Sequence, residues 1–93
     1  MLKKEKGKDE SIREVTELMD EVISDSSVPR NIRSAVEDAK NKLNSKDEAV
    51  GVTASSAIYF LQDITNDINM PAHTRTEIWT IISALEGIRE RHK

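Results

Sequence analysis

Apolar residues recur at helical spacing through most of the chain, in four segments that turn signals separate. Within each segment they follow one another at intervals of three or four residues, which places them on one face of an α-helix. No segment shows the sustained alternation of apolar and polar residues that is typical of a strand. The pattern predicts an all-α chain with helices near residues 11–24, 29–43, 46–66 and 71–90.

Polar residues mark where two of these helices are expected to begin. Ser11 and Glu14 match the capping box, in which a hydroxyl and a carboxylate bind free amides of the first turn. Ser45 and Glu48 repeat the match before the third segment. The two prolines of the chain suit the first turn of the other two helices. Because the joining loops are short, neighbouring helices are expected to run antiparallel.

One motif, Asp-x-x-apolar-Pro-x-x-x-Arg, occurs twice, at residues 25–33 and 67–75. An offset of 42 residues aligns four identical pairs: Asp25 with Asp67, Pro29 with Pro71, Arg33 with Arg75, and Leu43 with Leu85. The pairs lie at turns or at core positions. They predict an antiparallel up-and-down four-helix bundle built from two helix–turn–helix hairpin repeats. A fragment of a helical solenoid is the alternative, although two repeats are fewer than a solenoid normally needs.

Each copy of the motif places an aspartate at the C-terminal end of a helix, where a negative charge opposes the helix dipole. Asp25 and Asp67 can each accept amide protons from their own turn. We expect Asp25 also to pair with Arg33, eight residues on, as a structural clasp that fixes the angle of the hairpin. Asp67 and Arg75 are expected to form the same clasp in the second copy.

Three large side chains fall outside the predicted core faces and are candidate partner contacts. Trp79 takes the position that Glu37 occupies in the first copy, and tryptophan is enriched in interface hot spots. Val52 and Tyr59, seven residues apart, share the face of their helix that lies opposite its core face. Gly51 and the small side chains that follow it indicate close packing of another helix, inside the bundle or across a dimer. These features favour a non-catalytic protein–protein interaction module that self-associates.

The sequence contains no pattern typical of a catalytic or metal site. It has no cysteine, no Glu-x-x-His motif of a di-metal bundle and no glycine-rich phosphate loop. His73, in the first turn of the last helix, has no partner that the sequence places beside it. We therefore expect no catalytic residue, no metal ligand and no cofactor.

Charge is spread along the chain, and the formal net charge is −3. Residues 1–10 combine four lysines with three acids and are expected to form a flexible charged tail, whereas residues 11–93 are expected to form a single domain. No stretch approaches the ~20 apolar residues of a membrane span. The N-terminus lacks the apolar core of a signal peptide. The sequence thus predicts a soluble, intracellular protein with no membrane partner.

Several stretches resemble the uncharacterised protein family 0147. They are SVPRNIR at 27–33, ASSAIY at 54–59, ITND at 64–67, NMPAHTR at 69–75, and Trp79. The similarity covers nearly everything from about Ile12 to Ile88. The resemblance implies an up-and-down four-helix bundle and a cytoplasmic protein of archaeal origin. It brings no activity, cofactor or functional residue with it.

Two other classes of function stay open. A small nucleic-acid- or ribonucleoprotein-associated protein would use the lysine-rich start of the chain together with Arg30, Arg33, Lys40 and Lys42. Nucleic-acid binding usually shows a basic face, and the net negative charge and sparse aromatic residues argue against it. A small enzyme or ligand carrier would need a deep pocket that contains His73 beside a carboxylate.

Overall fold

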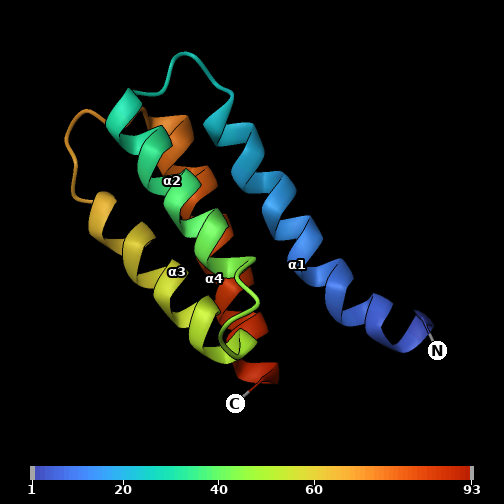
Figure 1. Cartoon of the computed structure of the whole chain (residues 1–93). Coiled ribbons are helices and arrows are strands. Elements are labelled where there is room, and N and C mark those ends of the chain that lie inside the picture. Colours follow the sequence, from blue (N-terminus) through green and yellow to red (C-terminus); the bar gives the residue numbers. More distant parts are fainter. Residues whose placement is uncertain (1, 93) are drawn as a thin grey trace.

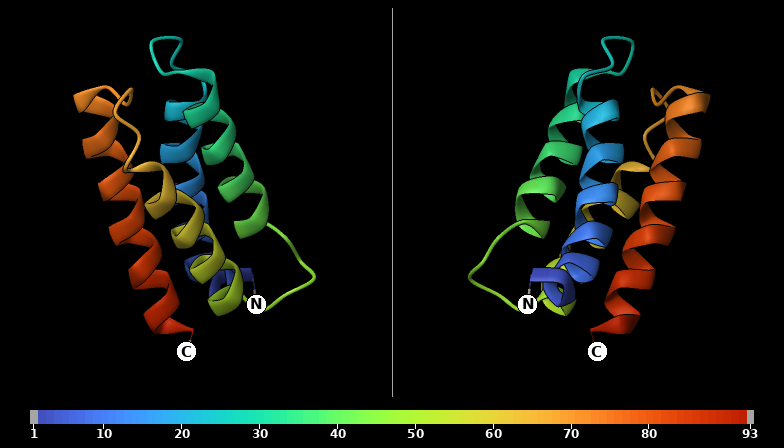
Figure 2. Two further views of the ribbon diagram at one scale, coloured as in Figure 1. Left: turned by 90° about the vertical axis from the view of Figure 1, so that its left-hand side faces the viewer. Right: turned by 90° about the vertical axis from the view of Figure 1, so that its right-hand side faces the viewer.

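Four helices form most of residues 2–92, the part of the chain that the computed structural model describes; side chains are described for residues 10–92. The helices are α1 (Leu2–Ile23), α2 (Arg30–Leu43), α3 (Val50–Ile64) and α4 (Ala72–Arg91). Both α1 and α3 pack against α2 and α4. The chain runs alternately up and down the bundle (Figure 1), and the side views agree (Figure 2). Residues 2–92 contain no strand. The predicted all-α, up-and-down four-helix bundle is confirmed.

One apolar core lies between the helices. It is built from the apolar faces that the sequence predicted, with contributions from all four helices. Its largest fully buried members include Met19, Ile32, Leu61, Ile78 and Leu85. Burying a side chain of this kind contributes about 1.5–3 kcal/mol relative to leaving it in water. The core therefore holds the two halves of the chain together.

Two corners at the same end of the bundle join α1 to α2 and α3 to α4 (Figure 1). We call residues 24–29 the first corner and residues 65–71 the second corner. In each corner, the amide of the apolar residue before the proline donates to the main-chain carbonyl of the aspartate, over 3.0 Å and 3.2 Å respectively. Those apolar residues, Val28 and Met70, are buried and close each corner onto the core. The offset of 42 that aligns the motifs also relates these contacts.

The prolines lie directly before α2 and α4, one position earlier than the expected first turn. Pro29 and Pro71 have φ of −55° and −60° and extended ψ values of 148° and 151°. Their carbonyls accept the amides of Arg33 and Arg75, each over 3.0 Å. A proline at this position costs no helical hydrogen bond, because its missing N–H would have no partner there.

Neither predicted capping box forms. Helix α1 begins well before Ser11, whose hydroxyl oxygen instead accepts a hydrogen bond of 3.0 Å from Arg91 of α4. Helix α3 begins after Glu48, which lies in the preceding loop and forms an ion pair of 2.6 Å with Lys42. A local cap contributes only about 1 kcal/mol. At Ser11, the continuation of α1 and the contact with Arg91 outweigh the local cap. At Glu48, the ion pair with Lys42 outweighs it.

The N-terminal segment differs in part from the predicted tail. Residues 2–10 continue α1 as a helix. Met1 and the side chains of residues 2–9 lie outside the described residues, so the flexibility predicted for residues 1–10 stays a prediction.

Two helical glycines give a matched prediction. A Cβ atom at Gly51 would lie 2.9 Å from the main-chain oxygen of His92, so α3 approaches the end of α4 closely here; at Gly87 the nearest atom would be Arg91 Nη1, 3.7 Å away. We expect Gly87→Ala to raise the free energy of unfolding by up to about 1 kcal/mol, because alanine lowers the entropic cost of helix formation. Gly51→Ala is expected to lower the free energy of unfolding, because the main chain at His92 or at Gly51 must move to make room for the Cβ atom. Thermal unfolding of both variants checks this, and stabilisation by Gly51→Ala would contradict it.

Candidate functional site

The face of α3 that points away from the core carries four residues at helical spacing. Val52, Ser55, Ser56 and Tyr59 stand at positions i, i+3, i+4 and i+7, which adjoin one another on one face of a helix. We call these four residues the outer strip. Val52 is 50% exposed and Tyr59 is 75% exposed. The structure thus places both predicted contact residues of α3 on one surface.

Helix α3 also carries very little charge. Asp63 is the one charged residue among its fifteen, whereas α2 has six among fourteen. A helix that packs on a core with one face normally shows charged residues on the other. The outer strip has none, and Asp63 follows it one turn beyond Tyr59, so α3 offers an uncharged surface from Val52 to Tyr59 where its neighbour α2 offers a charged one.

A shallow hollow of about 360 Å³ opens beside the outer strip. Ser55 and Ser56, Tyr59 and Phe60, and Lys42 of α2 line it. Because serine side chains are small, the surface is depressed between the larger residues. Because the hollow is shallow, it suits a side chain from another molecule better than a whole ligand, whose site usually buries most of the ligand's surface.

Trp79 lies on the side of α4 that faces α3. Arg75 shows this, because its guanidinium donates to the main-chain carbonyls of Thr65 and, over 3.3 Å, of Asp67 at the end of α3. Residues four apart share one side of a helix, so Trp79 follows Arg75 along that side. With 49% of its surface exposed, Trp79 adds aromatic surface next to α3.

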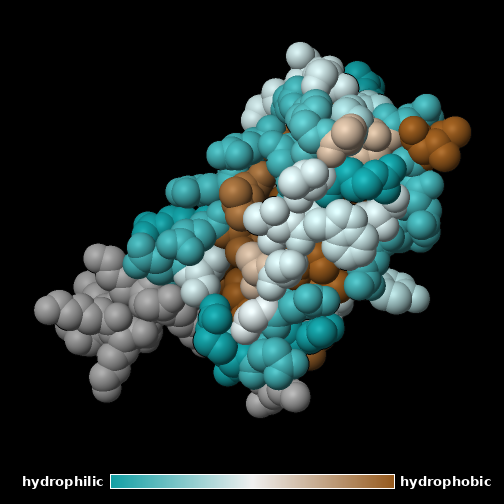
Figure 3. Space-filling model, turned by 180° about the vertical axis from the view of Figure 1, so that it is seen from behind, coloured by the Kyte–Doolittle hydropathy of each residue, from teal (hydrophilic) through white to brown (hydrophobic). Residues whose placement is uncertain are grey.

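Sequence reasoning missed two further exposed apolar residues. Phe60 is 40% exposed and lines the hollow, and Ile68 in the second corner is 91% exposed. Apolar surface appears in brown between polar helices in Figure 3, which views the molecule from behind. The signal for Ile68 was available, because the offset of 42 aligns it with Ser26, a polar residue of the first corner.

The two corner aspartates bind their own turns, as predicted. Oδ1 of Asp25 accepts the amide of Ser27 over 2.9 Å and its hydroxyl over 2.7 Å. Oδ1 of Asp67 accepts the amide of Asn69 over 2.8 Å. These donors offset the unfavourable position of a carboxylate at a helix C-terminus.

The other carboxylate oxygen of each aspartate reaches across to the opposite corner. Oδ2 of Asp25 lies 3.1 Å from Nε2 of His73, at the start of α4. Oδ2 of Asp67 accepts a hydrogen bond of 2.8 Å from the side-chain amide of Asn31, at the start of α2. Residues 31 and 73 are themselves 42 positions apart. The two contacts are therefore reciprocal: the aspartate of each corner binds the first turn of the helix that follows the other corner.

The arginines of the predicted clasps bind main chain instead of carboxylates. Nε of Arg33 donates to the carbonyl of Val28 over 3.0 Å, and Arg75 binds the carbonyls of the second corner. Within residues 10–92, neither arginine forms an ion pair with the aspartate of its own motif. The corners are thus fixed by arginine–carbonyl bonds within a hairpin and by aspartate contacts between hairpins.

These contacts favour the ionised form of both carboxyl groups. The pKa of Asp25 is lowered to about 2, first by the hydroxyl of Ser27, then by His73 and by the amide of Ser27. The pKa of Asp67 is lowered chiefly by the amide of Asn69 and then by the side chain of Asn31, with a smaller contribution from the charge of Arg75.

Acid should therefore destabilise the protein through Asp25. Its folded-state pKa of about 2 lies below the ordinary value of 3.8. The stabilisation is thus complete above about pH 4 and is lost as the pH falls from there toward 2. We expect the urea midpoint of Asp25→Asn to fall less steeply over this pH range than that of the wild type. Asp38→Asn, which removes an exposed carboxylate with no contact among residues 10–92, is the control and should keep the wild-type slope.

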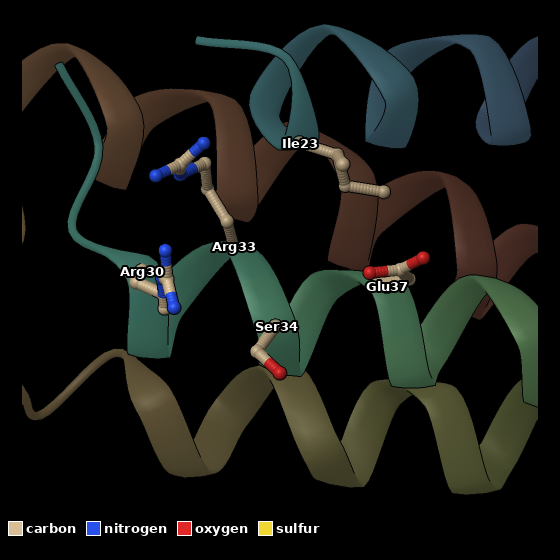
Figure 4. A pocket seen from close by; sticks show the side chains of 5 residues that line it. All are labelled: Ile23, Arg30, Arg33, Ser34 and Glu37. Atoms are coloured by element: carbon tan, nitrogen blue, oxygen red, sulfur yellow. The ribbon is translucent and has the colours of Figure 1, made fainter. Parts of the chain in front are cut away.

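A second pocket, of about 310 Å³, lies at the start of α2 beside the end of α1. Figure 4 shows the guanidinium groups of Arg30 and Arg33 at its corner end and Glu37 further along α2. The other two bases of the predicted nucleic-acid surface are paired: Lys40 with Asp20 over 2.7 Å, and Lys42 with Glu48. Only part of that predicted surface therefore presents unneutralised positive charge.

The described residues contain neither a cluster of metal-binding side chains nor a membrane-spanning helix. No three acidic or histidine side chains with described positions gather as they would around a metal ion. Over residues 2–92, no helix combines the length and the apolar character of a membrane span. The cytoplasmic location stays a prediction.

Comparison with known proteins identifies relatives of the whole chain. The model of the family described as "Uncharacterised protein family (UPF0147)" matches residues 1–88. The UPF0147 protein MJ1419 of Methanocaldococcus jannaschii is 46% identical over 85 residues, which cover 91% of each chain. The UPF0147 protein of Methanothermobacter thermautotrophicus is 47% identical over 81 residues, which cover 87% of this chain and 79% of that protein.

Two solved structures share the fold. The crystal structure of the unknown-function protein MMP1188 matches 82% of this chain and 86% of its own, with 43% identity and a TM-score of 0.80. The crystal structure of a UPF0147 protein from Thermoplasma acidophilum covers 86% of this chain and 94% of its own, with 38% identity and a TM-score of 0.81. The resemblance found in the sequence is therefore confirmed. From the family match and the extent of these similarities, the chain belongs to the uncharacterised protein family UPF0147.

Proposed function

We propose that this protein is a non-catalytic interaction module that self-associates through the outer strip of α3. The observation that carries the proposal is the outer strip, an uncharged and partly apolar stretch of α3 from Val52 to Tyr59, on a helix whose other face already packs on the core. Because such a face has no charged group, its burial costs no desolvation of a charge. Burial against a second uncharged surface releases water from Val52 and Tyr59, which favours association.

Neighbouring aromatic residues support the same surface. Phe60 is partly exposed and lines the hollow beside the outer strip, and Trp79 is partly exposed on the side of α4 that carries Arg75. Aromatic residues are enriched in interfaces because they bury large areas and lose little conformational entropy. The protein has three aromatic residues in all, and each is at least 40% exposed, so none of them is buried in the core.

The pair of His73 and Asp25 is explained without catalysis. Its counterpart at the other corner is Asn31 with Asp67, over 2.8 Å, and an asparagine cannot transfer protons as a general acid or base. Since both pairs join the aspartate of one corner to the first turn of the helix that follows the other corner, hydrogen bonding accounts for the histidine. The side chain of His73 is also 55% exposed, unlike that of a group held in a closed active site.

Light scattering on a size-exclusion column tests the proposal. We expect the wild type to elute with more than one chain per particle and with a mass that rises with protein concentration. Tyr59→Glu should give monomers, because association would bury an unpaired charge. Ser26→Glu, which adds the same charge at an exposed position of the first corner, between α1 and α2, is the control and should associate as the wild type does.

Trp79 gives a second readout, because it is the single tryptophan of the chain. Its emission should shift to shorter wavelength as the wild type associates, and should not shift in Tyr59→Glu. A wild-type protein that stays monomeric at every concentration would refute the proposal.

A further inference from the structure

The outer strip has an internal symmetry that specifies how two copies would meet; this inference rests on the proposed self-association. Val52 precedes Ser55 by three residues, and Tyr59 follows Ser56 by three residues. Large side chains thus flank two small ones at equal distances from a midpoint between Ser55 and Ser56. An antiparallel copy of the same strip matches this order when the midpoints coincide.

We propose that the partner is a second copy of this chain, whose α3 crosses α3 of the first copy antiparallel, with a two-fold axis between Ser55 and Ser56. Val52 of each copy then meets Tyr59 of the second copy. An interface of this type is isologous, because the same patch serves both sides and the assembly closes as a dimer.

The sizes of the side chains favour the antiparallel arrangement. In it, each aromatic ring of Tyr59 faces the smaller Val52, and the serines let the two helices approach closely at the crossing. The hollow lined by Ser55, Ser56, Tyr59 and Phe60 then receives a side chain of the second copy, as a knob enters a hole. A parallel arrangement would set Tyr59 against Tyr59 and Val52 against Val52, which gives a wide gap at one end.

Charge also favours a second copy over an unrelated partner. The outer strip has no charged residue, so a partner must be uncharged there to avoid burying an unpaired ion. Most surfaces of this protein do not meet that condition, since α2 alone carries six charged residues. The strip itself meets it. Phe60 lines the hollow beside the strip and would widen the contact toward the roughly 800 Å² per partner of a typical stable interface.

Disulfide crosslinking tests the geometry, because the chain has no cysteine of its own. Ser55→Cys and Ser56→Cys proteins are mixed and mildly oxidised, since residues that face each other across the axis come within the ~4.4–6.8 Å between Cα atoms that a disulfide requires. We expect rapid crosslinking of this mixture. Val52→Cys alone should not crosslink, because its two copies lie seven residues apart along the axis, roughly 10 Å.

The outcomes separate the geometry from the self-association. All variants are first checked under reducing conditions for helix content and for mass by light scattering. If Val52→Cys crosslinks with itself, the helices are parallel and the inference is wrong. If dimers form but the serine variants do not crosslink, the geometry is wrong and self-association stands. If light scattering shows only monomers, both proposals fail.

Discussion

Leu85→Ala is expected to lower the free energy of unfolding by about 2–5 kcal/mol, the cost of removing a leucine from a packed core. Leu85 has no exposed surface and lies in the cluster that all four helices share. A domain typically has about 5–15 kcal/mol of stability in total, and each kcal/mol corresponds to roughly 4–8 °C in Tm at this size. Urea and thermal unfolding measure the change.

Two comparisons make this result specific. Leu85→Met keeps most of the volume and should cost less than about 1.5 kcal/mol. Leu43→Ala, at the aligned position of α2 and 2% exposed, should cost as much as Leu85→Ala. Protein concentration must be held constant, because self-association would add to the apparent stability. A loss below about 0.5 kcal/mol, the range of ordinary surface substitutions, would place Leu85 outside the core.

Ala57→Leu is expected to destabilise the protein by about 1–3 kcal/mol for the opposite reason. Ala57 and Ala54 have no exposed surface, so α3 presses against its neighbours through methyl groups. Extra atoms there force the helices apart or strain rotamers. Gln62→Leu, which adds similar apolar character at an exposed position of α3, is the control and should change stability little. An equal effect of both variants would show that hydrophobicity, and not volume, was responsible.

The helices and the core were predictable because their signals are local. Apolar residues at intervals of three and four fix which face of each helix is buried, and the structure buries those faces in Ile32, Ile78 and their neighbours. The prolines likewise mark the starts of α2 and α4 to within one residue. Each of these features depends on residues that lie within about two helical turns of one another.

The corner contacts were not predictable in the same way. The sequence placed Asp25 beside Arg33, eight residues on, but the carboxylate instead faces His73, 48 residues away. The outcome depends on how the two hairpins are aligned along the bundle axis, which the core decides. The same holds for Ser11, which reads as a helix cap and instead accepts a hydrogen bond from Arg91.

For the candidate interface, the sequence identified the residues and the structure identified the surface. Val52, Tyr59 and Trp79 stood out because they break the periodicity of the core faces, and all three are partly exposed. The hollow next to them was not foreseeable, because Lys42 from another helix forms one of its walls.

By itself, the sequence determined that this chain forms four helices, which faces they bury and where two of its turns lie, since hydrophobic spacing and proline geometry act over a few residues. Only the tertiary structure decided which polar groups meet when they lie far apart in the sequence. Hydrogen bonds form between the donors and acceptors that the packed core brings within about 3 Å of each other. Asp67 and Asn31 form such a bond although they are 36 positions apart, and no local sequence pattern predicts that they meet.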